Sequence, residues 1–174
     1  MRALAAFVAA GAFAATVTVN AAPEHARLVA MSGSWDVEMT LWPRPGGAGL
    51  RTTGTSTIRP LLGGLFVEEQ IDGALNGVPF TTLAWTGFNT ATHQYEATRI
   101  SSTNSIRIAE TGGFDEKANQ FELKADYASG GDTWHQRTVI QPTTPDTMIA
   151  VSYLSFGNVP EWEAVEIKYT RRVK

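Results

Sequence analysis

The stretch Ser34–Leu41, which reads SWDVEMTL, decides the fold class of this chain. Its apolar residues, Trp35, Val37, Met39 and Leu41, alternate one by one with polar residues. Because successive side chains of a β-strand point to opposite faces, this alternation predicts a strand with one buried face and one face in water.

The same alternation recurs outward from this stretch, in residues 121–127 (FELKADY) and 165–170 (VEIKYT). Turn-forming pairs such as Asn76-Gly77 and Gly130-Gly131 separate the apolar runs, since glycine accepts a positive φ without penalty. The pattern predicts about ten strands, near residues 34–42, 51–59, 64–73, 77–88, 93–101, 104–112, 118–127, 131–141, 146–156 and 161–173.

The connections between these segments are all too short to hold a helix that crosses between parallel strands. We therefore expect an all-β fold of consecutive antiparallel hairpins, preceded by a short helix over residues 23–31. About ten strands in one sheet are more stable when the sheet closes, because closure removes the edges. The sequence predicts an up-and-down β-barrel, and a two-sheet sandwich is the alternative.

The N-terminus has the three parts of a secretory signal peptide. Arg2 supplies a positive charge, an alanine-rich apolar run extends from Ala3 to Val19, and small residues follow at Ala21 and Ala22. We expect residues 1–21 to be a signal peptide cleaved after Ala21 or Ala22, and residues 22–174 to form one domain that is periplasmic or secreted. A transmembrane helix is the alternative, but it needs about 20 apolar residues.

Composition excludes several kinds of site. The 174 residues contain no cysteine, which excludes disulfides, thiolate catalysis and cysteine-ligated metals. The formal net charge is −3 and no basic patch follows a strand, so nucleic-acid binding has no electrostatic support. The three histidines do not form an H-E-x-x-H motif, and no G-x-S-x-G motif is present. We therefore expect no catalytic residue, no metal site and no cofactor.

Two segments at opposite ends of the chain predict how the barrel closes. Gly33-Ser34-Trp35 opens the first predicted strand, and Tyr169-Thr170-Arg171 closes the last. In an up-and-down barrel these strands are neighbours, so Arg171 can lie against the indole of Trp35 and reach the carbonyls of the short helix. This pairing resembles the calycin superfamily, which includes lipocalins and fatty-acid-binding proteins.

A wider set of segments resembles the uncharacterised bacterial family DUF1579, whose members have a lipocalin-like barrel. The matching segments are 25–28, 31–35 (MSGSW), 62–66 (LGGLF), 77–80 (GVPF), 87–89 (GFN), 113–115 (GFD) and 167–171 (IKYTR). The resemblance implies a fold but no activity. The family often carries Trp and Asp where this chain has Arg99 and Ser101, so a family site built on those two groups does not carry over.

If Trp35 faces inward, alternation puts five polar side chains on inner rows: Glu69, Arg99, Glu110, His135 and Arg137. Inward charges must pair or meet water, so one interpretation is a buried ion-pair network. The other is a ligand cavity in which Arg99 or Arg137 binds a carboxylate. Its apolar wall would then contain Phe80, Phe88, Tyr153 and Tyr169.

The inward row of residues 131–141 stays open, because Trp134 and Ile140 lie on the row opposite His135 and Arg137. His135 is also the residue on which two minor hypotheses depend. One is a metal site with Asp132 and Glu110, and the other is an axial ligand to a haem.

Three functions remain open. The first is a binding module for a small apolar or amphiphilic ligand. The second is a structural or interaction protein of the cell envelope, which would have a filled barrel and an exposed aromatic patch at Trp42, Trp85 or Trp134. The third is an enzyme that uses Glu110, His135 or Glu69 as acid or base.

Overall fold

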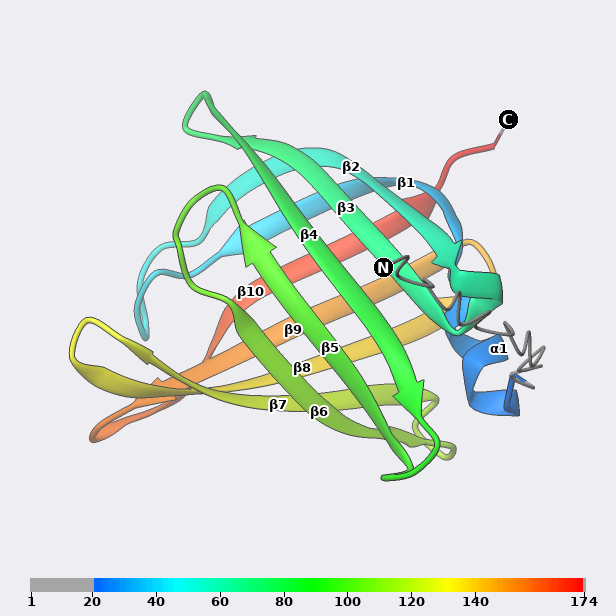
Figure 1. Ribbon diagram of the computed structural model, residues 1–174. Coiled ribbons are helices and arrows are strands. Elements are labelled where there is room, and N and C mark those ends of the chain that lie inside the picture. The colour runs from blue at the N-terminus through cyan, green and yellow to red at the C-terminus, as the bar shows by residue number, and fades with distance from the viewer. Residues whose placement is uncertain (1–20, 174) are drawn as a thin grey trace, which may run out of the picture.

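The computed structural model describes residues 21–173, and the predicted signal peptide lies almost wholly outside them. Helix α1 (Pro23–Ala30) precedes ten antiparallel strands (Figure 1). The strands are β1 (Gly33–Leu41), β2 (Leu50–Leu61), β3 (Phe66–Leu75), β4 (Val78–Asn89), β5 (Gln94–Ser101), β6 (Ile108–Asp115), β7 (Gln120–Ser129), β8 (Asp132–Thr144), β9 (Thr147–Phe156) and β10 (Val159–Arg171).

The ten strands form a closed barrel in which each strand pairs with its neighbours in sequence and β10 pairs with β1. The closing ladder runs from Trp35 opposite Arg171 to Leu41 opposite Val165, and Figure 1 shows β1 and β10 side by side. The predicted up-and-down barrel is confirmed, and the sandwich alternative is wrong.

The strand boundaries follow the predicted turns. Asn76 and Gly77 both have positive φ, 51° and 80°, as a tight two-residue hairpin requires. The start of β6 is the main difference, at Ile108 instead of residue 104. Asn104 explains it, because its side-chain oxygen accepts a hydrogen bond from the backbone N–H of Ile106 and holds this segment in a loop.

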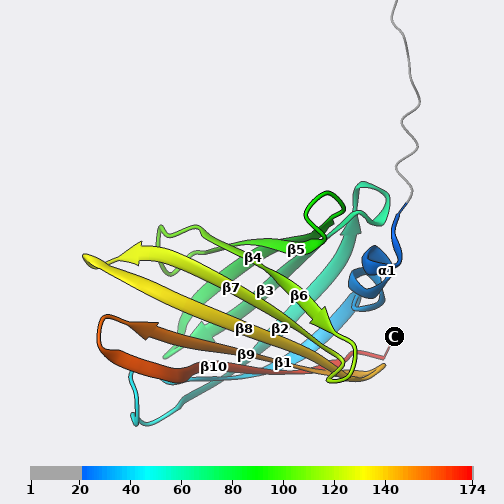
Figure 2. The same cartoon turned by 90° about the horizontal axis from the view of Figure 1, so that it is seen from below.

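Helix α1 covers one end of the barrel (Figure 2). The side chain of Leu28 in this helix is buried, and the phenol of Tyr95 donates a hydrogen bond to the carbonyl of Glu24. Below the helix, Tyr95 and Phe121 meet edge to face, with 4.9 Å between ring centroids. This end is therefore closed by packed aromatic and aliphatic side chains, and any large interior space must lie toward the opposite end.

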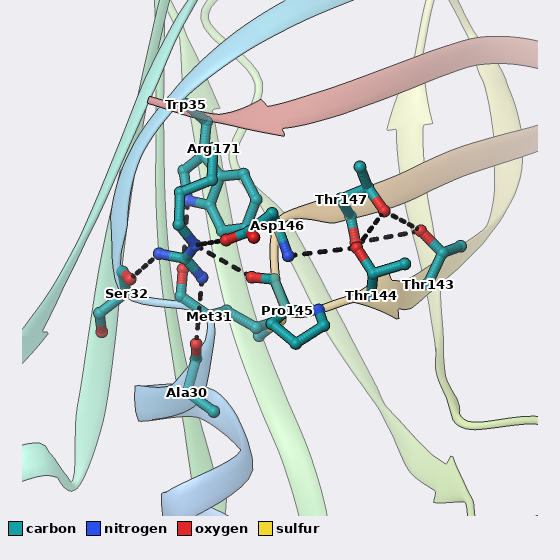
Figure 3. Close-up of polar contacts among 10 residues, drawn as sticks. All are labelled: Ala30, Met31, Ser32, Trp35, Thr143, Thr144, Pro145, Asp146, Thr147 and Arg171. Atoms are coloured by element: carbon teal, nitrogen blue, oxygen red, sulfur yellow. Dashed lines mark hydrogen bonds and ion pairs between the residues drawn. The ribbon is translucent and has the colours of Figure 1, made fainter. Parts of the chain in front are cut away.

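Arg171 fastens α1 to the closing ladder (Figure 3). Its guanidinium lies 4.1 Å from the Trp35 ring centroid and donates hydrogen bonds to the carbonyls of Ser32 and Ala30. The Trp35 indole in turn donates to the carbonyl of Met31. Gly33, with φ of 148°, leaves the space that the guanidinium fills. The predicted contact between Arg171, Trp35 and the helix is confirmed.

Candidate functional site

The barrel encloses two spaces stacked along its axis. A small cavity of about 50 Å³ lies below α1 and is lined partly by Leu28 and Met31. A larger cavity of about 330 Å³ lies toward the end away from α1, where the β5–β6 loop contributes Thr103 and Asn104. Four side chains border both cavities and so mark the floor between them: Arg99, Ser152, Val165 and Ile167.

The larger cavity has a mainly apolar wall with a few polar groups. Its apolar lining comes from Met39, Leu41, Ile71, Leu75, Phe80, Ile108, Leu154, Val165 and Ile167, and its polar lining from Thr82, Arg99, Ser101, Thr103, Asn104, Gln136 and Ser152. A mainly apolar wall with a few polar groups is typical of a small-molecule site, and its volume is at the lower end of the range of about 300–1,000 Å³.

Arg99 and Glu110 form an incomplete ion pair at this floor. The Arg99 Nε lies 3.6 Å from Glu110 Oε2, which is too long for a normal hydrogen bond. Glu110 is fully buried, and its Oε1 accepts hydrogen bonds from Gln136 (3.1 Å) and Thr138 (2.6 Å). Within residues 21–173, neither Arg99 Nε nor Glu110 Oε2 has a hydrogen-bond partner.

The Arg99 side chain is 21% exposed although it lies inside the barrel, because its free surface borders the two cavities. Burial lowers the pKa of Arg99, but attraction to Glu110 and Glu69 outweighs this, so its pKa lies above the ordinary value. The guanidinium therefore stays charged and presents its N–H groups to the interior.

Glu69 and Tyr169 complete the polar floor, on the side of the smaller cavity. The Glu69 Oε1 accepts a hydrogen bond from Ser56 at 2.9 Å. Burial and, next, the negative charge of Glu69 raise the pKa of Tyr169 well above its ordinary value. Tyr169 is thus a neutral phenol beside a carboxyl group and a guanidinium.

Three predicted site residues lie on the outside of the barrel. The inner row of β8 carries Gln136 and Thr138, which are buried, so His135 and Arg137 point outward. His135 Nδ1 contacts Asp126 Oδ1 at 2.7 Å on the surface. Arg137 lies 4.0 Å from the ring centroid of Tyr153.

Arg137 also binds both oxygens of Glu161, at 3.1 and 2.6 Å. Arg137 and Tyr153 therefore contact each other on the outer wall, and the prediction that they line the interior is wrong. Because His135 points to the outer surface, it is neither an interior haem ligand nor near buried Glu110, so the metal and haem hypotheses that rest on it are wrong. Within the described part of the chain, no three His, Asp or Glu side chains gather in a way that could hold a metal ion.

The remaining predicted residues lie inside the barrel at different heights. Phe80 borders the larger cavity, and Tyr169 borders the smaller one. Phe88 instead packs under α1, 5.0 Å from Tyr95 between ring centroids. The sequence analysis did not identify Ser152, Gln136 and Thr138. Gln136 and Thr138 alternate in step with Trp134 and Ile140, and this shared row was the signal that could have placed them inside the barrel.

The three tryptophans proposed for an exposed patch are half-buried. The Trp85 indole donates to Glu68 Oε2 at 2.8 Å. Trp134 stacks on Phe156 with 4.3 Å between centroids. Trp42 accepts a hydrogen bond at its carbonyl from the indole of Trp162. Each of the three tryptophans is therefore partly covered by its neighbours and is not fully exposed. No helix among residues 21–173 has the length and apolar character to cross a lipid bilayer.

The chain matches one protein-family model and is similar in fold to solved structures. A family model described as "Protein of unknown function (DUF1579)" matches residues 20–171. The chain is similar in structure to Rv2717c from M. tuberculosis, with 13% identity, a TM-score of 0.64, and coverage of 88% of this chain and 100% of that one. It is also similar to the S-type phycobiliprotein lyase CPES from Guillardia theta, with 10% identity, a TM-score of 0.54, and coverage of 84% and 91%.

At such low identities, these two likenesses show the barrel fold alone. No curated protein sequence matches the chain. The family model, by contrast, covers nearly all of the described residues. The predicted resemblance is confirmed, and the chain belongs to the DUF1579 family.

Proposed function

We propose that this protein binds a small, mainly apolar molecule in the larger cavity, with a polar group of that molecule against Arg99. The observation that carries the proposal is the position of Arg99, whose charged guanidinium borders a cavity of about 330 Å³. An apolar wall supplies most of the binding free energy, at about 25 cal/mol per Å² of apolar surface removed from water. The polar floor supplies orientation.

Two competing functions have less support. The hypothesis of an interaction protein predicts a filled barrel, whereas this barrel holds a cavity of about 330 Å³, and Trp42, Trp85 and Trp134 are half-buried. An enzyme that pairs His135 with Glu110 or Glu69 needs those groups within hydrogen-bond reach of one another, and His135 lies on the outer surface.

We also propose that binding takes place outside the cytoplasm, in the periplasm or after secretion. Support comes from the charged start, apolar run and small-residue cleavage pattern of residues 1–21.

The test of binding combines native mass spectrometry with a cavity-filling variant. The protein is purified with and without organic extraction, then titrated with methyl decanoate. Ser152→Phe places a ring at the cavity floor, whereas Ser155→Phe places the same ring on the outer face of the same strand, opposite His135. We expect the ligand adduct to be lost in Ser152→Phe and kept in Ser155→Phe. Equal binding by both variants, or the absence of any adduct on the parent protein, whether co-purified or formed with an added probe, would overturn the proposal.

A further inference from the structure

We infer that the polar group of the bound molecule is an uncharged hydrogen-bond acceptor, such as an ester, ketone or amide carbonyl, and not a carboxylate. This inference rests on the proposed function, and it names the class of ligand that the same cavity selects. Two features of the floor carry it: the free donors of Arg99 and the acids that surround that residue.

The first feature is a set of unused donors. A guanidinium carries five N–H groups in a rigid plane. In the part of the chain that the structure describes, the polar contact of Arg99 is the 3.6 Å approach to Glu110, and its buried Nε has no hydrogen-bond partner. The Nε–H is buried against Glu110, so the donors open to a ligand are those of the rest of the guanidinium, whose side chain borders both cavities. They require an acceptor, so an alkylammonium ion or a pure hydrocarbon leaves them unsatisfied.

The second feature is the charge balance of the floor. Among the described residues that border the two cavities, Arg99 is the cation and Glu69 is the acid. Glu110 lies fully buried behind Arg99 as a second acid. One formal positive charge therefore already faces two formal negative charges. A carboxylate would add a third negative charge in a partly enclosed, mainly apolar cavity where screening by water is reduced, whereas a carbonyl satisfies the donors without adding charge.

The test uses three probes that share an unbranched chain of ten carbons but differ in head group: methyl decanoate, sodium decanoate and decylamine. Calorimetric titration of the mature protein at neutral pH measures each dissociation constant. We expect the ester to bind at least about tenfold more tightly than the acid or the amine, a difference of about 1.4 kcal/mol. Arg99→Lys should weaken ester binding, because an ammonium cannot reproduce the planar arrangement of donors.

The charge argument is tested with a conservative pair of variants. Glu69→Gln removes one negative charge from the floor, on the side of the smaller cavity, and can still accept the hydrogen bond from Ser56. It should raise the affinity for decanoate several-fold and leave that for the ester nearly unchanged. Glu166→Gln is the matched control, since Glu166 pairs with Lys168 on the outer wall, and it should change neither affinity.

The outcomes separate the inference from the function on which it rests. Tightest binding of decanoate or of decylamine to the parent protein would overturn the inference and leave the binding function standing. An ester-to-acid ratio unchanged in Glu69→Gln would also overturn the charge argument. Failure of all three probes to bind would overturn the proposed function itself.

Discussion

Arg99 and Glu110 face each other inside the barrel across 3.6 Å, and within residues 21–173 the two facing atoms, Nε and Oε2, have no hydrogen-bond partner. The opposite oxygen of Glu110 is satisfied twice, by Gln136 and Thr138. A buried polar cluster that is only partly satisfied costs stability. Here the Arg99 side chain also borders the two cavities, so the arrangement suits ligand binding better than it suits folding.

We predict that single substitutions of this pair are strongly non-additive. Arg99→Met leaves Glu110 buried without its cation, and it should lower the free energy of unfolding by about 3–5 kcal/mol. Adding Glu110→Gln removes the stranded charge while an amide oxygen can still accept from Thr138. The double variant should therefore be more stable than Arg99→Met. Urea unfolding of the four proteins, analysed as a double-mutant cycle, measures the coupling.

A matched control comes from the outer wall. Arg137→Met breaks the contact with Glu161, whose side chain is 45% exposed, and such exposed pairs contribute about 0–1 kcal/mol. If Arg99→Met proves no more costly than Arg137→Met, or if the two interior substitutions simply add, the interior pair is not coupled as described.

Arg171 should be required for the docking of α1. Arg171→Lys keeps the charge but loses the planar contact with Trp35 and the simultaneous hydrogen bonds to Ser32 and Ala30. We expect a loss of about 1–2 kcal/mol in unfolding free energy. Amide hydrogen exchange in residues 24–31 should also accelerate more than exchange in the strands.

Arg172→Lys is the control for this prediction, because Arg172 is an exposed neighbour paired with Asp36. Its effect should stay within about 0.5 kcal/mol. Equal exchange rates for α1 in Arg171→Lys and the parent protein would show that packing of Leu28 and the hydrogen bond from Tyr95 hold the helix without Arg171.

The export signal gives a separate prediction. Expressed in a Gram-negative host, the chain should appear outside the cytoplasm with Ala22 or Pro23 as its first residue, which intact-mass measurement can establish. Ala10→Arg places a charge in the apolar run and should leave the uncleaved chain in the cytoplasm. Cytoplasmic accumulation of the unaltered chain at full mass would contradict the prediction.

Sequence pattern was sufficient for the strands and for their closure. The alternation in residues 34–41 and 121–127 assigns the buried face directly, and Asn76-Gly77 marks a hairpin with its own backbone geometry. The contact between Arg171 and Trp35 followed from topology, because the first and last strands of an up-and-down barrel are neighbours.

The site was harder to predict, because β8 alternates in a way that fits either face. His135 and Arg137 find partners on the outer wall in Asp126 and Glu161, whereas Gln136 and Thr138 supply hydrogen bonds that buried Glu110 needs. These hydrogen bonds join Glu110 to Gln136 and Thr138, which lie 26 and 28 positions later in the sequence. The volume of the cavity also depends on how side chains from every strand pack, which periodicity does not specify.

Glu68 gives the barrel an acid-sensitive contact. A hydrogen bond from the Trp85 indole and, next, one from Arg59 lower the pKa of Glu68 below its ordinary value. A lowered folded-state pKa contributes stability at pH values above the ordinary glutamate range, and this stability is lost as pH falls through the folded-state pKa. Glu68→Gln should therefore be less stable than the parent protein at about pH 7 and similar to it at about pH 3, by urea midpoints. A constant difference across that range, or the same pH trend in Glu38→Gln on exposed β1 surface, would contradict this assignment.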